Sequence, residues 1–373
     1  MSKKEVKILP DLKTKEQIPV TKPFLPPLEE YKQLLEGIWE RNWLTNNGPL
    51  VEELEQKLKS FLRLDRNLLY VTNGTIALQL AIKALKLKGE IITTPFSYVA
   101  TTSSIVWEGC TPVFVDIEPE RLTIDPAKIE EAITDNTSAI LATHVYGLPC
   151  FVDEIQDIAD RHGLKVIYDA AHAFGCVYRG KSLYDYGDIS TASFHATKLF
   201  HTVEGGAVMA RDQQVNKELF HARNFGHAGP ENFHNVGING KNSEVHAAMG
   251  IVNLRYINQV MSERKKQALL YRELLAESPI RFLEIPEDLE YNHAYVPVIF
   301  PSEKSLLEAV EKMAAQGISP RRYFYPGLDT LNYVKSGHLP MSEDISKRVL
   351  CLPVYEGVGE VDLQRIVRQL LES

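Results

Sequence analysis

The residues with the clearest chemical potential form a short polar segment around one lysine. Lys198 ends the run at 193–198 (SFHATK), and Glu-Gly-Gly-Ala follows at 204–207. We expect a turn here between two buried strands, where a charged ammonium group is costly to desolvate. A lysine in such a place is useful when its amine is neutral, because a neutral amine can form a Schiff base with a carbonyl. The alternative is a solvated surface lysine, and the residues upstream argue against it.

A second group of reactive residues lies at 169–175 (DAAHAFG), directly after the apolar run at 165–168. A carboxylate at the end of a buried strand needs a cationic partner or several hydrogen-bond donors. The protonated pyridine nitrogen of pyridoxal phosphate would be such a partner for Asp169, and its charge makes that cofactor an effective electron sink. His172 could donate to the phenolic oxygen of the same cofactor. A helix cap is the alternative for the aspartate, but it leaves the histidine and the alanines unexplained.

Two further segments follow predicted strands and could hold the rest of such a cofactor. Gly74 and Thr75 open a helix after the strand at 68–71, and their backbone N–H groups, with the threonine hydroxyl, would bind a phosphate. Tyr98 comes just after the strand at 90–93, where its ring could stack on a flat heteroaromatic group. Taken alone, the segment with Gly74 and Thr75 could instead be an ordinary strand-to-helix turn with a threonine cap. Tyr98 could instead be an aromatic residue packed on the sheet.

The elements that must position these residues alternate along the chain. This alternation predicts an α/β fold with a mostly parallel sheet covered on both faces, whose ligands collect at the carboxyl ends of the strands. We expect a large domain at 1–250, which includes the N-terminal segment, and a smaller C-terminal α/β domain at 251–373. The predicted strands are 68–71, 90–93, 111–115, 139–143, 165–168, 206–210 and 295–300. The predicted helices are 28–41, 50–62, 75–85, 152–161, 243–275, 305–316 and 361–371.

Composition excludes several classes of function. With 44% hydrophobic and 24% charged residues, the 373-residue chain is typical of a soluble enzyme. Its formal net charge of -8 offers no basic surface for nucleic acid or an anionic membrane. No run approaches the ~20 apolar residues of a membrane span. Because the four cysteines are scattered and no His-Glu-x-x-His motif occurs, we expect no metal site, no disulfide framework and a cytoplasmic location.

Taken together, these motifs resemble the DegT/StrS-type aminotransferases, which are pyridoxal-phosphate enzymes of fold type I acting on nucleotide-linked keto sugars. The Asp-Ala-Ala-His, Ser-Phe-His-x-x-Lys and Glu-Gly-Gly-Ala motifs occur in the family's order. The resemblance extends from 23–27 (PFLPP) and 43–49 (WLTNNGP) into the C-terminal domain. It therefore covers nearly the whole chain.

The resemblance implies a role for each candidate residue. Lys198 would hold the cofactor through a Schiff base and then move the proton, and His195 would lie beside it, either as a catalytic residue or to orient the turn. Asn239, in 237–240 (GING), matches an asparagine that reaches the cofactor phosphate from the partner subunit, so a homodimer with shared active sites is implied. The remaining cofactor contacts are implied for Asp169 at the pyridine nitrogen, His172 at the phenolic oxygen, Tyr98 on the ring, and Gly74, Thr75 and Ser193 at the phosphate.

Two segments depart from the family pattern, and both concern the substrate. Lys241 stands where many relatives have arginine, and 321–327 (RRYFYPG) replaces a segment with His-Tyr followed by Pro-Leu-His. Lys241, Arg321 and Tyr325 are therefore candidates for substrate binding, and the Arg321-Arg322 pair could meet a diphosphate or remain solvated. These variants look most like the family members that make dTDP-4-amino-4,6-dideoxyglucose.

The implied activity is transamination of a nucleotide-linked 4-keto-6-deoxyhexose, with dTDP-4-keto-6-deoxyglucose as the expected substrate and glutamate as the amino donor. The amino sugar would serve glycans such as the O-antigen of lipopolysaccharide. A transaminase acting at C3 or on another ketone, and a non-catalytic regulator on the same fold, stay open as alternatives. A sugar dehydratase would carry histidine in place of Lys198, and a Rossmann dehydrogenase would need a Gly-x-Gly-x-x-Gly motif after the first strand.

Overall fold

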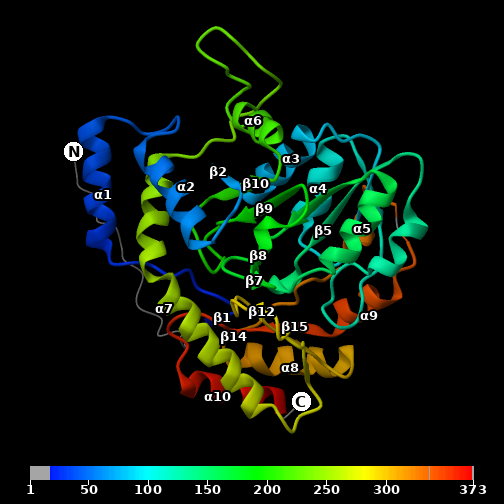
Figure 1. Cartoon of the computed structure of the whole chain (residues 1–373). Coiled ribbons are helices and arrows are strands. Elements are labelled where there is room, and N and C mark those ends of the chain that lie inside the picture. Colours follow the sequence, from blue (N-terminus) through cyan, green and yellow to red (C-terminus); the bar gives the residue numbers. More distant parts are fainter. Residues whose placement is uncertain (1–16, 336, 372–373) are drawn as a thin grey trace, which may run out of the picture.

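The computed structural model describes residues 17–335 and 337–371. Its centre is a seven-stranded sheet with the order β2-β10-β9-β6-β5-β3-β4 (Figure 1). β10 runs antiparallel to β2 and β9, and the other neighbouring pairs are parallel, so the predicted α/β fold is confirmed. The strands are β2 (Asn67–Val71), β3 (Glu90–Thr93), β4 (Thr111–Phe114), β5 (Thr137–Thr143), β6 (Lys165–Asp169), β9 (Ile189–Ser193) and β10 (Gly206–Ala210).

Helices cover both faces of this sheet because the strands carry apolar side chains on both sides. Along β2, Leu69 and Val71 belong to one hydrophobic cluster, and Leu68 and Tyr70 belong to another. α3, α4 and α6 pack into the first cluster, whereas α1, α2, α5 and α7 pack into the second. The helices are α1 (Leu28–Arg41), α2 (Pro49–Phe61), α3 (Gly74–Ala84), α4 (Val99–Trp107), α5 (Val152–His162), α6 (Gln213–Ala222) and α7 (Glu244–Leu274).

A second hydrophobic core lies below the sheet in Figure 1 and contains mainly C-terminal elements. Its antiparallel sheet has the order β11-β13-β15 and packs with α8 and α10. The N-terminal strand β1 pairs in parallel with β14 and places Ile18 in this core. The elements of this core are β1 (Ile18–Pro19), β11 (Arg281–Phe282), β13 (Val296–Ile299), α8 (Glu303–Ala315), β14 (Ile318–Ser319), β15 (Val349–Leu352) and α10 (Glu360–Leu371). α9 (Pro340–Arg348) packs instead through Ile345 into the cluster that contains Leu68 and Tyr70. A third small sheet joins β12 (Leu289–Glu290), β7 (Val177–Tyr178) and β8 (Lys181–Ser182).

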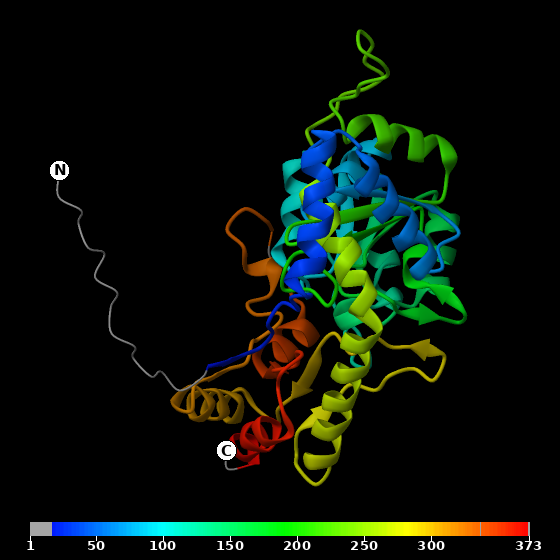
Figure 2. The same cartoon turned by 90° about the vertical axis from the view of Figure 1, so that its left-hand side faces the viewer.

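α7 connects the two cores as one unbroken helix of 31 residues. Its first half packs against the sheet layer through residues such as Ile251 and Val260, and its second half packs into the second core through Ala268 and Tyr271. Figure 2 shows this helix, in yellow-green, running from the sheet layer down to the C-terminal elements. The helix passes through position 250 without interruption, and the predicted division into 1–250 and 251–373 stays a prediction.

The segment between α6 and α7 projects from the body of the molecule, as the green loop at the top of Figures 1 and 2 shows. Its two arms are joined by isolated bridges between Asn224 and Asn239 and between His227 and Phe233. Phe233 and Val236 are 65% and 73% exposed, which is unusual for side chains of this kind. The segment thus carries apolar side chains away from both cores.

Candidate active site

A cavity of about 440 Å³ lies where β5, β6 and β9 end, beside the first turns of α3 and α4. Thr143, Asp169 and Ser193, the last residues of those three strands, all line it. C-terminal residues supply the opposite wall through Tyr295, just before β13, and Leu352, the last residue of β15. The cavity therefore occupies the place where parallel α/β sheets bind ligands, as predicted.

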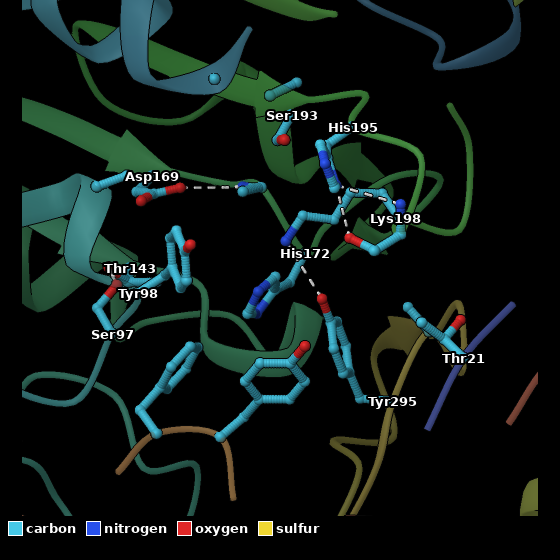
Figure 3. A pocket seen from close by; sticks show the side chains of 18 of the residues that line it. Thr21, Ser97, Tyr98, Thr143, Asp169, His172, Ser193, His195, Lys198 and Tyr295 are labelled. Atoms are coloured by element: carbon cyan, nitrogen blue, oxygen red, sulfur yellow. Dashed lines mark hydrogen bonds between the residues drawn. The ribbon is translucent and has the colours of Figure 1, made fainter. Parts of the chain in front are cut away.

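Lys198 follows β9 and directs its amine into this cavity, as Figure 3 shows. Its Nζ donates a hydrogen bond of 3.3 Å to Tyr295 Oη. Burial lowers the pKa of the Lys198 amine, and the nearby Asp169 carboxylate opposes this shift without cancelling it. The neutral, nucleophilic form of the amine is thus more accessible here than on the protein surface.

Asp169 presents a carboxylate that is only 6% exposed. Thr101 Oγ1 donates to its Oδ2 at 2.7 Å, and the backbone N–H of Ala171 donates to its Oδ1 at 3.1 Å. Burial raises the pKa of Asp169, and these two donors and the Lys198 charge counteract the shift only in part. Within the described residues this carboxylate forms no ion pair, so a cationic ligand in the cavity would stabilise it.

His172 is buried beside the cavity in a defined protonation state. The backbone N–H of Tyr146 donates to its Nδ1 at 3.0 Å, so a neutral imidazole carries its proton on Nε2. Burial lowers the pKa of His172 well below its ordinary value, and the Lys198 charge acts in the same direction. The ring lies nearly parallel to the rings of Tyr146 and Phe324, at interplanar angles of 8° and 4°. His172 can therefore act as a fixed neutral donor.

The predicted phosphate-binding residues meet at the first turn of α3. Asn73 caps this helix, because its side chain accepts a hydrogen bond from Ile76 N at 2.8 Å; the cap is therefore not Thr75. A Cβ on Gly74 would lie 2.9 Å from Ser193 Cβ, so glycine is what allows the helix to approach β9 this closely. Gly74, Thr75 and Ser193 all line the cavity. The N-terminal end of α3 and the hydroxyls of Thr75 and Ser193 thus border the same cavity, an arrangement that suits an anion.

Tyr98 and His195 also line the cavity, as the sequence predicted. Tyr98 precedes α4 and is 56% exposed. His195 Nδ1 lies 2.8 Å from Thr197 Oγ1, and its Nε2 lies 3.6 Å from the Glu204 carboxylate. Because the backbone of His195 also accepts a hydrogen bond from Lys198 N, its contacts favour a role in shaping the turn.

The predicted substrate residues separate into two groups. Arg321 lines the cavity, whereas Tyr325 and Lys241 do not. Asn239, predicted for the cofactor phosphate of the partner subunit, does not line the cavity of its own chain either. Lys241 Nζ donates to Asn239 Oδ1 at 2.6 Å on the projecting segment. Tyr325 is 49% exposed and lies under the guanidinium of Arg322, 3.6 Å from the ring centre.

Sequence reasoning missed several residues of the site. Thr101 holds Asp169, Tyr295 contacts Lys198, and Phe324 stacks in parallel with His172. Tyr323 and Phe324 were within the segment identified as divergent, so a signal for them existed. Thr21 lines the cavity from the N-terminal segment, and nothing in its neighbourhood in the sequence pointed there.

The residues present fit pyridoxal phosphate. The buried Asp169 carboxylate lacks a cation, the Gly74–Ser193 contact forms an anion cradle, and Lys198 provides an amine whose pKa is lowered. Among the described residues, no group of three or more histidine, cysteine, aspartate or glutamate side chains is arranged to hold a metal ion. Likewise, no helix in the described part of the chain is both long and apolar enough to span a membrane.

Comparison with known proteins gives consistent results. The model of the DegT/DnrJ/EryC1/StrS aminotransferase family matches residues 28–371. The Escherichia coli dTDP-4-amino-4,6-dideoxy-D-glucose transaminase is 42% identical over 368 residues, covering 95% of this chain and 98% of that protein. A pleiotropic regulatory protein of Geobacillus stearothermophilus is 32% identical, with 94% and 98% covered. A solved structure of DesI in the presence of its TDP-sugar product superposes with a TM-score of 0.91 at 33% identity, covering 96% of this chain and 93% of that one.

Proposed function

The chain belongs to the DegT/DnrJ/EryC1/StrS aminotransferase family, and from this premise we propose that it transfers an amino group to a nucleotide-linked 4-keto-6-deoxyhexose with pyridoxal phosphate as cofactor. The observation that carries the proposal is that Lys198 and Asp169 line the same cavity. There, the amine of Lys198 would bind the cofactor's aldehyde and the carboxylate of Asp169 would bind its ring nitrogen. A protein that only binds a ligand has no need of a partly buried lysine amine whose pKa is lowered.

When bound, pyridoxal phosphate supplies an aldehyde that accepts the amino group and a protonated ring that withdraws electrons from the reacting carbon. Lys198 would hold the group covalently and, once released, take a proton from the donor's α-carbon and return it. Asp169 would keep the ring nitrogen protonated, and His172 Nε2–H would donate to the phenolic oxygen. Gly74, Thr75 and Ser193 would bind the phosphate.

The expected substrate is dTDP-4-keto-6-deoxyglucose. This proposal is supported by the 42% identity to a dTDP-4-amino-4,6-dideoxy-D-glucose transaminase and by the similarity to DesI, whose structure contains a TDP-sugar product. Glutamate is proposed as the amino donor. The similarity to a protein described as a regulator keeps the non-catalytic alternative in view, and amination at C3 is the enzymatic alternative.

Arg321 is proposed to bind the anionic groups of the substrates, and Arg322 is not. Arg321 is exposed at the cavity, and its guanidinium lies 5.2 Å from the ring centre of Tyr323. In contrast, Arg322 donates to Glu303 at 2.8 Å and to the carbonyl oxygen of Lys347 at 3.0 Å, so its donors serve the fold. A diphosphate or a donor carboxylate would find in Arg321 a planar pair of N–H groups. Substrate contacts by Lys241 and Tyr325 stay predictions.

A homodimer with shared sites is also part of the proposal. Asn239 is exposed on the projecting segment, outside the cavity of its own chain. The same segment exposes Phe225, Phe233, Val236 and Ile238, which is typical of a surface that a partner covers. A second copy would thus receive Asn239 near its phosphate site. The cytoplasmic location stays a prediction.

The test is an assay with pyridoxal phosphate, glutamate and dTDP-4-keto-6-deoxyglucose, in which mass spectrometry follows the nucleotide sugar. The proposal predicts a product whose ketone has become an amine, and NMR would then assign position and configuration. Conversion of the cofactor by glutamate without any sugar product would retain the aminotransferase and refute the proposed substrate. Failure of both half-reactions would favour the ligand-binding alternative.

A further inference from the structure

Tyr295 approaches Lys198 from the opposite side of the cavity and has no role in the proposals above. Lys198 Nζ donates to Tyr295 Oη at 3.3 Å, and the dashed line between them in Figure 3 crosses the cavity. The Tyr295 ring also lies 4.5 Å from the His172 ring, centre to centre. Its hydroxyl is thus in contact with the reacting amine and is held beside a second residue of the site.

The backbone around Tyr295 is fixed by buried hydrogen bonds. Asn292, which is fully buried, donates through Nδ2 to the carbonyl oxygens of His172 and Phe174, each at 2.9 Å. Its Oδ1 accepts a hydrogen bond from Ala294 N at 3.0 Å. Arg264, only 2% exposed, donates to Ala294 O at 3.1 Å. These contacts tie residues 292–294, directly before Tyr295, to the loop that follows Asp169.

We propose that Tyr295 positions the released Lys198 amine for proton transfer, an inference that rests on the proposed function. In the observed hydrogen bond the amine is the donor and the phenol oxygen the acceptor. A neutral amine that donates one N–H keeps its lone pair free to take the substrate's proton. Tyr295 thereby limits the directions in which that lone pair can point when Lys198 is no longer bound to the cofactor.

The tyrosine ring and its hydroxyl can be tested separately. Tyr295→Phe keeps the ring packed against His172 and removes only the contact with Lys198. Tyr291→Phe is the matched control, because Tyr291 lies on the same segment, donates to Tyr146 O at 2.9 Å and does not line the cavity. Thermal unfolding of both variants would verify that each is folded.

The experiment follows cofactor absorbance in a single turnover of the pyridoxal-phosphate holoenzyme with glutamate, and with glutamate deuterated at the α-carbon. For Tyr295→Phe we expect a conversion rate at least about tenfold lower, a larger deuterium isotope effect than in the wild type, and a half-saturating glutamate concentration within about twofold. Tyr291→Phe should match the wild type in all three.

Two results would overturn the inference. One is a Tyr295→Phe protein with the rate and isotope effect of the wild type. The other is an equal loss in Tyr291→Phe, which would assign the effect to the packing of the segment. A wild-type protein that does not convert its cofactor with glutamate would refute the proposed function itself, and the inference with it.

Discussion

At the scale of single residues, the site depends on two groups whose ordinary charge is disfavoured by burial. Burial raises the pKa of Asp169 and lowers that of Lys198. The buried carboxylate of Asp169 would be stabilised by a bound cationic ring. The lowered pKa of Lys198 makes its neutral amine more available to react with an aldehyde.

Asp169→Asn tests the first of these shifts. The amide cannot hold the ring nitrogen in its protonated form, so the rate of cofactor conversion by glutamate should fall on the order of 100-fold. The same substitution removes a carboxylate that burial destabilises, so the melting temperature of the cofactor-free protein should not decrease. A clear decrease in that temperature, with the rate unchanged, would contradict the assigned role.

The pH dependence tests the second shift. Proton abstraction needs the neutral form of Lys198, so the rate of the glutamate half-reaction should rise with pH and level off above the pKa of this amine. Because burial lowers that pKa, the midpoint should lie below the ~10.4 of an unperturbed lysine. A rate that still rises at pH 10 would show that the amine is not desolvated as the structure indicates.

At the scale of elements, the first turn of α3 packs so closely against the end of β9 that Gly74 has no room for a side chain. Gly74→Ala would place a Cβ 2.9 Å from Ser193 Cβ and push the helix away from the strand. We expect a loss of about 1–3 kcal/mol in the free energy of unfolding and weaker binding of pyridoxal phosphate. Gly359→Ala, where a Cβ meets nothing within 4 Å, is the control, and equal effects in both variants would refute the explanation.

The sequence was sufficient for most of the elements and for the residues that one strand end or one motif supplies, but the predicted ranges did not include β9, α4, α6 and α9. Asp169, His172 and Lys198 were predicted because they lie at or just after strands of the sheet, whereas Ser193 was predicted from the family resemblance. Tyr295 and Phe324 were missed because they come from the C-terminal part of the chain and reach the cavity by packing against the hydrophobic cluster of the sheet layer, which no local pattern specifies. Periodicity likewise does not reveal that Thr101, on the first turn of α4, would hold Asp169.

At the scale of the whole molecule, the proposal that two chains complete two sites depends on Asn239, which is exposed on the projecting segment. The proposal predicts that Lys198→Arg and Asn239→Asp are each inactive alone. Refolded together, they should recover about a quarter of the wild-type activity, since half of the dimers would be mixed and each would contain one intact site. A mixture that stays inactive while size measurements show dimers would contradict the sharing of sites.

The central claim is that the Lys198 amine is the group that holds the cofactor. Borohydride reduction of the protein with pyridoxal phosphate, followed by peptide mass spectrometry, tests it most directly. The account predicts a single reduced adduct on Lys198, loss of the absorbance of the lysine-bound cofactor, and neither change in Lys198→Arg. An adduct on another lysine, or the same adduct yield in Lys198→Arg, would contradict it.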